Sequence, residues 1–372
     1  MRRLPMLIAA LFIAGGSLVG ALPAPEFPVP APATVTIPKQ NTEIPAGLLF
    51  VCVQDEARIA VVDMASRSVV RTIDLQALGF PATAKPHYIR VDPDRRHWYV
   101  SLIGANTVAK FNARDEIVGR FTMETPGMIA LSGEKQMVVT RSMSAVNPPK
   151  RMAVIDRTTM TGTEVDVLFP RPHPVAVAGG FAYTGSLGTN QVASVNLDTE
   201  RVAIVNVEGT THAFVQFDVS PDGRTLVGST EVSGQLLVFD LATPARPALT
   251  ASIPLGKMAF DPIFTPDGRE VWVPVKMDNE IAVIDVATWK VTRRITNPDF
   301  MQPHQVVFSS DGKTAFVSNN NKMDHMADPA HAGHVMPGAD GSAALVVLDV
   351  ATGKSVSSIT LGKNLTGMGT AR

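Results

Sequence analysis

Histidine and methionine gather in one short stretch near the C-terminal end of the chain. The whole chain has 8 histidines, yet several fall between residues 323 and 336. A solvated loop gives methionine nothing to pack against, whereas thioether and imidazole ligands together suit copper, and the thioether favours Cu(I). The sequence therefore predicts a copper site here, with zinc able to compete through Asp324 and Asp328. A composition-biased loop or a partner-binding surface is the alternative. The candidate ligands are Met323, His325, Met326, His331, His334 and Met336.

A second set of histidines shares a local context rather than a single segment. His87, His173 and His304 each follow a proline directly and occupy the same position of a repeated unit. His212 lies slightly earlier in the corresponding position of its own unit. Imidazoles that converge from separate units could bind a metal ion or an anionic cofactor. The alternative is that Pro-His is a repeat feature that hydrogen-bonds neighbouring backbone.

The repeated unit predicts the elements that position these residues. An apolar strand, an Asp or Asn, and a turn ending in Thr or Ser recur about every 45 residues, a spacing typical of four-stranded propeller blades. The recurring positions are Asp63, Asn112, Asp156, Asn196, Asp240, Asp285 and Asp349. We therefore expect an all-β, seven-bladed propeller of four-stranded antiparallel blades.

A second phrase marks another hairpin in each unit. Pro-Asp-Gly or a close variant precedes β-branched and aromatic strands, because Pro presets φ and Gly supplies the positive φ of a tight turn. The phrase begins at Asp92, Ser220, Thr265 and Ser309. The first unit begins at its second strand, so the C-terminal strand around residues 363–368 should complete it and close the ring.

This topology relates the two candidate sites. The three Pro-His positions begin the innermost strands and should surround one mouth of the central channel. The last unit is about 20 residues longer than the others, with the insertion between its second and third strands. Because strands alternate in direction, the Met/His-rich insertion should emerge at that same mouth.

The repeats resemble the YVTN-repeat, YncE-like family of seven-bladed β-propellers over residues 47–372. Phe316-Val317-Ser318-Asn319, the strand from Ile281 to Asp285, and Pro303-His304 carry the resemblance. Wider relatives are the propeller domains of nitrous oxide reductase and cytochrome cd1. The resemblance implies the fold, and members of the family include binding proteins, surface proteins and cofactor-carrying oxidoreductases. This chain lacks the full copper-cluster histidine set of nitrous oxide reductase.

The N-terminal residues resemble an export signal. Residues 1–21 combine a basic start, an apolar stretch and small residues before a cleavage position, and residues 22–46 form a proline-rich spacer ahead of the propeller at 47–372. We expect a periplasmic or secreted protein without a stable membrane anchor after cleavage. Whether export uses the Sec or the twin-arginine route stays open. The single Cys52 cannot form an internal disulfide and belongs to no Cys-x-x-Cys-His haem attachment motif.

Three functions remain open at this level. The first is a periplasmic binding protein for copper or for a metalloprotein partner. The second is a copper- or haem-dependent oxidoreductase or cofactor-maturation protein using the channel histidines, with haem the less favoured cofactor. The third is a metal-free protein-interaction scaffold. The net charge of -1 gives no reason to expect nucleic acid as a partner.

Overall fold

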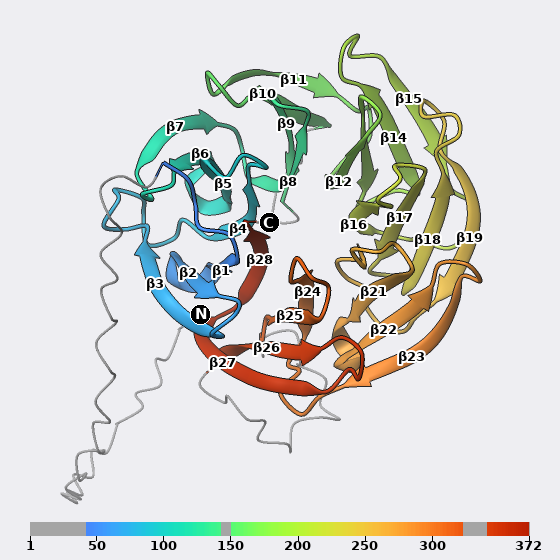
Figure 1. Cartoon of the computed structure of the whole chain (residues 1–372). Helices are drawn as coiled ribbons and strands as arrows, with labels where there is room; N and C mark the ends of the chain where they lie inside the picture. The colour runs from blue at the N-terminus through green and yellow to red at the C-terminus, as the bar shows by residue number, and fades with distance from the viewer. Residues whose placement is uncertain (1–41, 143–149, 323–340, 372) are drawn as a thin grey trace, which may run out of the picture. The chain divides into compact units, whose positions relative to one another are not determined.

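The structure is a computed structural model that describes residues 42–142, 150–322 and 341–371. Their strands form seven sheets, each of four antiparallel strands, arranged around a common centre as blades (Figure 1). The expected seven-bladed propeller is confirmed. Within the described residues, no helix is long and apolar enough to cross a bilayer.

The blades are numbered in chain order, and each is given from its innermost strand outward. Blade 1 consists of β28 (Leu365–Thr370), β1 (Leu48–Val53), β2 (Arg58–Asp63) and β3 (Ser68–Asp74). Blade 2 consists of β4 (Pro86–Val91), β5 (His97–Leu102), β6 (Thr107–Asn112) and β7 (Ile117–Thr122). Blade 3 consists of β8 (Pro126–Ser132), β9 (Gln136–Arg141), β10 (Arg151–Asp156) and β11 (Thr161–Asp166). Blade 4 consists of β12 (Pro172–Ala178), β13 (Phe181–Ser186), β14 (Gln191–Asn196) and β15 (Val202–Asn206).

The remaining three blades follow the same order. Blade 5 consists of β16 (Phe214–Val219), β17 (Thr225–Thr230), β18 (Gln235–Asp240) and β19 (Ala248–Pro254). Blade 6 consists of β20 (Ile263–Phe264), β21 (Glu270–Val275), β22 (Glu280–Asp285) and β23 (Lys290–Thr296). Blade 7 consists of β24 (Pro303–Phe308), β25 (Thr314–Asn319), β26 (Ser342–Asp349) and β27 (Ser355–Lys363). Three 3-10 helices, η1 (Gln54–Glu56), η2 (Ile103–Ala105) and η3 (Lys276–Asp278), connect second to third strands.

The side-chain pattern explains why each strand occupies its position. Every residue of β1 and β24 is buried, because the inner strands pack between neighbouring blades on both sides. The outermost strand β7 instead alternates between partly buried and exposed residues, as a strand with one solvated face does. The described blades therefore pack face to face through continuous apolar strands.

The two turn phrases have the roles that the sequence predicts. Asp285 Oδ1 accepts the N–H of Thr288 at 2.8 Å, and Asp63 does the same for Ser66 at 2.6 Å, so these acidic residues form turns between third and fourth strands. In the other hairpin, Gly223 and Gly268 have φ of 72° and 70°, the left-handed conformation that glycine adopts without strain.

Pairing of β28 with β1 closes the ring, as the sequence predicts. Leu49 lies opposite Thr370 and Val51 opposite Met368 in an antiparallel ladder. The C-terminal strand thus supplies the innermost strand of the first blade. The chain already contacts the propeller slightly before residue 47, since Ile44 is buried and its N–H donates to the carbonyl of Arg95 at 2.7 Å.

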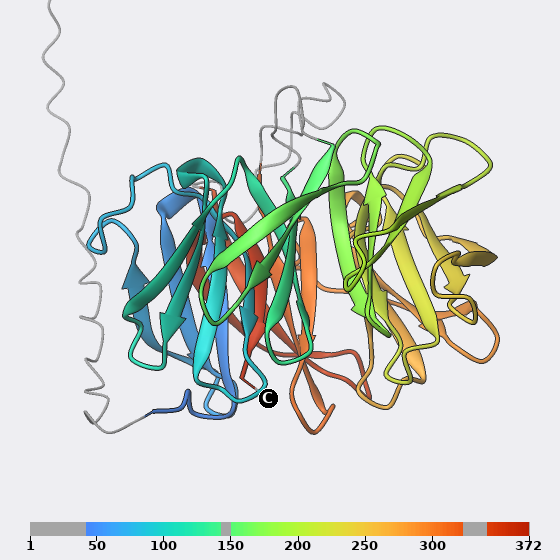
Figure 2. The ribbon, with the colours of Figure 1, turned by 90° about the horizontal axis from the view of Figure 1, so that it is seen from above.

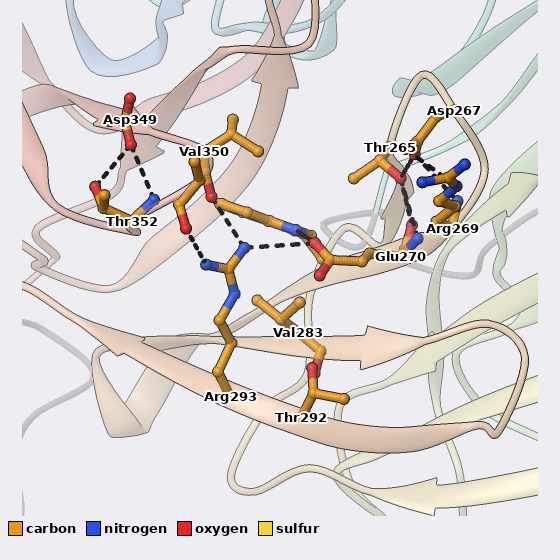
Figure 3. A network of polar contacts seen from close by, with 12 residues as sticks. Thr265, Asp267, Arg269, Glu270, Val283, Thr292, Arg293, Asp349, Val350 and Thr352 are labelled. Carbon is orange, nitrogen blue, oxygen red and sulfur yellow. Dashed lines mark hydrogen bonds and ion pairs between the residues drawn. The ribbon is translucent and has the colours of Figure 1, made fainter.

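Polar contacts between outer strands also join neighbouring blades. The guanidinium of Arg293 on β23 donates to the carbonyl of Val350 at 3.0 Å and to Glu270 Oε2 at 3.4 Å (Figure 3). Glu270 also accepts from the indole of Trp272 at 2.9 Å. Blades 6 and 7 are therefore tied at their periphery as well as through their apolar faces.

Gly367 tests how tightly the closing strand packs. A Cβ at this position would clash with the carbonyl oxygen of His87 and lie 2.7 Å from the Cα of Tyr88, both on β4. We therefore expect Gly367→Ala to lower the free energy of unfolding by about 1–3 kcal/mol in urea titrations. Gly188→Ala is the matched control, because its Cβ would meet Pro170 Cγ at an ordinary 3.7 Å. Equal stability of both variants would contradict this packing.

Candidate functional site

Three buried imidazoles from different blades lie where the inner strands begin, at one end of the propeller, which we call the histidine face. His87 on β4, His173 on β12 and His304 on β24 are 6%, 1% and 4% exposed. Each is the second residue of its strand and follows the proline that begins it. The ring centroids of His87 and His173 lie 6.3 Å apart, although the two residues belong to β4 of blade 2 and β12 of blade 4, which are not neighbouring blades.

The hydrogen bonds of two rings fix which nitrogen is available. His173 Nδ1 lies 2.6 Å from the carbonyl oxygen of Val215, and His87 Nδ1 lies 2.9 Å from Gln54 Oε1. Because both oxygens are acceptors, each Nδ1 carries the proton and each Nε2 keeps its lone pair. Neither Nε2 has a hydrogen-bond partner, and His304 Nδ1 is likewise buried without one.

Burial keeps these rings neutral. It lowers the pKa of His87 to about 3 and that of His173 to about 4, with the neighbouring His173 and Lys276 lowering the His87 value further. Burial also lowers the pKa of His304 well below its ordinary value, with Lys276 the next cause. Neutral imidazole is the form that ligates metal ions.

Lys276 is the positive charge beside the imidazoles. It lies in η3 of blade 6, is 9% exposed, and its Nζ sits 4.3 Å from the ring centroid of Phe260. The Phe260 ring in turn lies 5.1 Å from that of His304. Burial lowers the pKa of Lys276 to about 8, while the nearby carboxylates of Glu231 and Asp261 oppose that shift. The lysine therefore remains largely protonated at neutral pH.

His212 is built into the fold in a different way. Its Nδ1 lies 2.9 Å from Ser233 Oγ and its Nε2 lies 3.1 Å from the carbonyl oxygen of Glu208. The ring packs beside Phe214 at 5.9 Å. With both nitrogens engaged, His212 has no free ligand atom of the kind that the other three rings offer.

A polar layer lies directly beneath the imidazoles. The Tyr88 hydroxyl oxygen accepts hydrogen bonds from Gln216 Nε2 at 2.9 Å, from Gln305 Nε2 at 3.2 Å and from Arg90 at 2.9 Å. Tyr88 and Gln305 directly follow His87 and His304 on their strands. Contacts from blades 2, 5 and 7 thus meet at one phenol oxygen and join the inner strands across the centre.

The rings of His87 and His173 lie at a spacing that two ligands of one metal ion can have. Two imidazoles that share an ion at 2.0–2.1 Å from each nitrogen have ring centroids between about 5 and 6.5 Å apart, depending on the angle at the metal. The 6.3 Å between His87 and His173 is compatible with such a pair. The three imidazoles do not form a group whose donor atoms all lie within 4.8 Å of one another in the described part of the chain.

One group in residues 42–142, 150–322 and 341–371 does meet that distance, namely Asp92, Asp94 and His97. It lies at the other end of the inner strands. Asp92 already accepts a hydrogen bond from the Tyr99 hydroxyl at 2.8 Å and pairs with the buried guanidinium of Arg157. Arg157 therefore already supplies the positive charge that a metal ion would bring.

The Met/His-rich stretch falls outside the described residues. Met323, His325, Met326, His331, His334 and Met336 all belong to residues 323–340. The flanking chain can be placed, because β25 ends at Asn319, and Asn320 N–H donates to the carbonyl of Gln302 at 3.0 Å. Gln302 stands two residues before His304, so the chain enters this stretch at the histidine face.

Sequence reasoning missed several residues of the channel. Lys276 lies in the connection between two strands, where no sequence pattern marks it as a channel residue. Tyr88 and Arg90 have the residue types of ordinary strand positions. Asp261 follows Phe260 in the position that Gln305 occupies after His304, and the sequence already places both Asp218 and Asp261 next to inner strands that can face the channel. The structure buries Asp261 to 2% exposure with neither carboxylate oxygen hydrogen-bonded.

Comparison with known proteins identifies the architecture. No protein-family model and no curated protein matches the sequence. A functionally unknown protein from Desulfotomaculum acetoxidans is similar over 87% of this chain and 98% of its own, with a TM-score of 0.67 and 13% identity. The periplasmic gluconolactonase PpgL of Pseudomonas aeruginosa is similar over 86% and 98%, with a TM-score of 0.66 and 20% identity. The dihydro-heme d1 dehydrogenase NirN is similar over 92% and 79%, with a TM-score of 0.59 and 15% identity. These similarities show the shared seven-bladed β-propeller fold.

The buried imidazoles predict how stability depends on pH. Their pKa values are lower in the folded protein than in the unfolded chain, so protons bind preferentially to the unfolded chain as pH falls through 6.5. His173→Gln should therefore make the loss of stability between pH 6.5 and 4.5 shallower, by about 1 kcal/mol per pH unit. Urea unfolding across this range measures the effect, and parallel profiles for the variant and the parent would contradict it.

Asp261 should act in the opposite direction. Burial raises its pKa to about 7, against the effects of Arg90 and Lys276, so the folded protein holds a proton that the unfolded chain releases above about pH 4. Its contribution to stability is present at low pH and declines as pH rises to 7. Asp261→Asn should thus steepen the acid-induced loss and raise stability at pH 8. A melting temperature of Asp261→Asn below that of the parent protein at pH 8 would contradict the view that the Asp261 carboxyl has no partner.

Proposed function

We propose that this chain is an exported, periplasmic β-propeller of the YVTN-repeat type that binds a transition metal ion, copper, at its histidine face. The function is binding rather than catalysis. His87 and His173 would supply the first imidazole ligands, and the Met/His-rich residues 323–340 would supply the thioethers that favour Cu(I). A metalloprotein partner that gives or receives the ion fits the same proposal.

The arrangement of His173 and His87 carries this proposal. In metal sites, a ligating histidine usually donates its other ring N–H to a carbonyl or carboxylate oxygen, which fixes the tautomer and the ring orientation. His173 has that arrangement with the Val215 carbonyl, and His87 has it with Gln54. Both Nε2 atoms are buried and unpartnered, a state that ordinarily has a reason. A metal ion would satisfy both.

The location of the protein is part of the same proposal. A basic start, an apolar stretch and small residues occupy positions 1–21. The gluconolactonase with the same fold is described as periplasmic, which is consistent with export of this chain. Copper is encountered outside the cytoplasm by exported proteins, and neutral imidazoles suit both copper and zinc.

Lys276 favours a second candidate, an anionic cofactor such as haem. Its ammonium group lies among the imidazoles and would repel a metal cation but attract a carboxylate. The structurally similar NirN is a dehydrogenase of a haem d1 compound, so a propeller of this fold can serve such a cofactor. In that case the protein would act as an oxidoreductase or in cofactor maturation. A scaffold that binds only proteins would retain neither metal nor cofactor.

Copper retention tests the metal proposal. The full mature protein, loaded with Cu(I), Cu(II) or Zn(II) and desalted, should retain stoichiometric copper by elemental analysis. His173→Gln should weaken binding at least about tenfold, since it removes a ligand. His212→Gln is the matched control, being a buried histidine of the same face whose nitrogens are both engaged. Equal copper content in both variants would remove the channel site from the account.

The pH dependence separates the channel from the Met/His-rich stretch. Solvated histidines lose metal as pH falls below their ordinary pKa near 6.5, because protons compete for the ligand. His87 and His173 stay neutral to about pH 4, so copper affinity of a variant lacking residues 323–340 should change less than about threefold between pH 7.5 and 5.5. A steep decline would place the ion on solvated ligands. Failure of that variant to bind copper would assign the site to the deleted residues.

Lys276→Met separates the metal from the anionic cofactor. Removing the ammonium should strengthen copper binding at least about threefold, because a like charge no longer opposes the ion. The same change should weaken binding of an anionic porphyrin. Titrations of the variant and the parent with Cu(I) and with haem measure both. Tighter haem binding together with weaker copper binding would exclude this electrostatic account.

A further inference from the structure

A cavity opens at the other end of the inner strands, which we call the turn face because the Asp-Gly turns lie there. Its volume is ≈ 550 Å³, within the range of small-molecule sites. His87, His173 and His304 do not line it, so it is distinct from the site described above. Its polar lining includes Tyr88, Arg90, Asp92, Gln216, Asp218, Asp261 and Gln305.

Asp261 is the unusual group in this cavity. It is 2% exposed, and neither carboxylate oxygen has a hydrogen-bond partner. The lack of hydrogen bonds has a local cause. The next residue, Pro262, has no N–H to donate, and the regular ladder of β20 with β21 begins only at Ile263. Leaving a buried acceptor unsatisfied costs about 1–3 kcal/mol, and more for a charged group. Asp261 lines the cavity although both of its oxygens are covered, so a ligand that donates to the carboxylate must displace the groups that cover it.

The charges around the cavity have opposite signs. Asp92 of blade 2, Asp218 of blade 5 and Asp261 of blade 6 provide carboxylates. Asp92 is already paired with Arg157, and Asp218 Oδ2 accepts the N–H of Phe264 at 2.9 Å. Arg90 of blade 2 provides a guanidinium. Two of its five donors are directed to the Tyr88 hydroxyl and the Ile89 carbonyl, at 2.9 and 3.3 Å.

Arg90 and Asp261 influence each other without bonding. The charge of Arg90 lowers the pKa of Asp261 against the larger effect of burial, yet no hydrogen bond joins the two side chains. A ligand with one cationic and one anionic end could contact both groups. Its two ends would form charge-assisted hydrogen bonds, which are about twice as strong as neutral ones.

We propose that this cavity is a second binding site, for a small zwitterion of the free α-amino-acid type. The ammonium group would donate to Asp261 and lie beside Asp218, and the carboxylate would accept from Arg90. The prolines of the turns, Pro93, Pro221 and Pro266, would form a rigid apolar wall for the side chain. This site does not depend on metal binding at the histidine face.

Binding should release a proton. Asp261 faces Arg90, Lys276, Asp218 and the Tyr88 hydroxyl, and its pKa of about 7 leaves it largely protonated below neutrality. An ammonium group favours the carboxylate form, so affinity should rise as pH increases from 5.5 to 7.5. The expected increase is about twentyfold, because one proton must leave Asp261 at the lower pH.

Thermal shift with the free L-amino acids, followed by calorimetric titration of those that raise the melting temperature, tests the proposal. At least one should bind with one site per chain. Methylammonium and acetate, which each carry only one end, should bind at least about tenfold more weakly. Asp261→Asn and Arg90→Met should each reduce affinity at least about tenfold. Asp94→Asn, an exposed turn-face carboxyl that does not line the cavity, should leave it unchanged.

Three results would overturn the site. They are no binding by any L-amino acid, unchanged affinity in Asp261→Asn, and binding of acetate as tight as that of the amino acid. Misfolding is separable, because removal of an unpartnered carboxyl should not lower the melting temperature of the ligand-free variant at pH 8. His173→Gln should retain amino-acid binding, so loss of the copper site and loss of this site are distinguishable.

Discussion

Pairing between β28 and β1 joins the end of the chain to its beginning, and the channel depends on it. Without this pairing the inner strand of blade 1 is missing, and the first and last blades present open edges. The contact also joins the first and last strands of the described chain, so its closure costs more chain entropy than the pairing within any other blade. Gly367 permits it, because β28 approaches β4 closely enough that a side chain would not fit. The side view in Figure 2 shows the strands of the blades running between the two faces of the ring.

Closure brings polar groups from different blades into a buried space, and burial then governs their chemistry. The imidazoles of His87 and His173 lose their charge because solvent is excluded, whereas Asp261 retains a proton for the same reason. The Tyr88 hydroxyl lies between these groups and receives donors from blades 2, 5 and 7. Desolvation of a few groups by a scaffold stabilised mainly by apolar faces is thus the physical basis of both sites that we propose.

The sequence was sufficient for the fold and for part of the site. Periodic Asp and Gly turns and continuous apolar strands indicate blades directly, because they are local signals. Pro-His at three blade starts likewise predicted that His87, His173 and His304 share one face. The partners of each ring could not be read in this way. Val215 and Gln54 form hydrogen bonds with histidines of other blades. Only the hydrogen bonds of His212 with Ser233 and Glu208 distinguish it from the other channel histidines. Such contacts depend on register between blades, which no local pattern encodes.

We propose that the buried Nε2 atoms of His87 and His173 bind copper. Anomalous diffraction at the copper absorption edge, from crystals of the full chain loaded with Cu(I), locates the ion directly. We expect anomalous density in the channel about 2 Å from both Nε2 atoms. Density confined to other positions, such as Asp92, Asp94 and His97, or a channel without copper in loaded crystals, would contradict it.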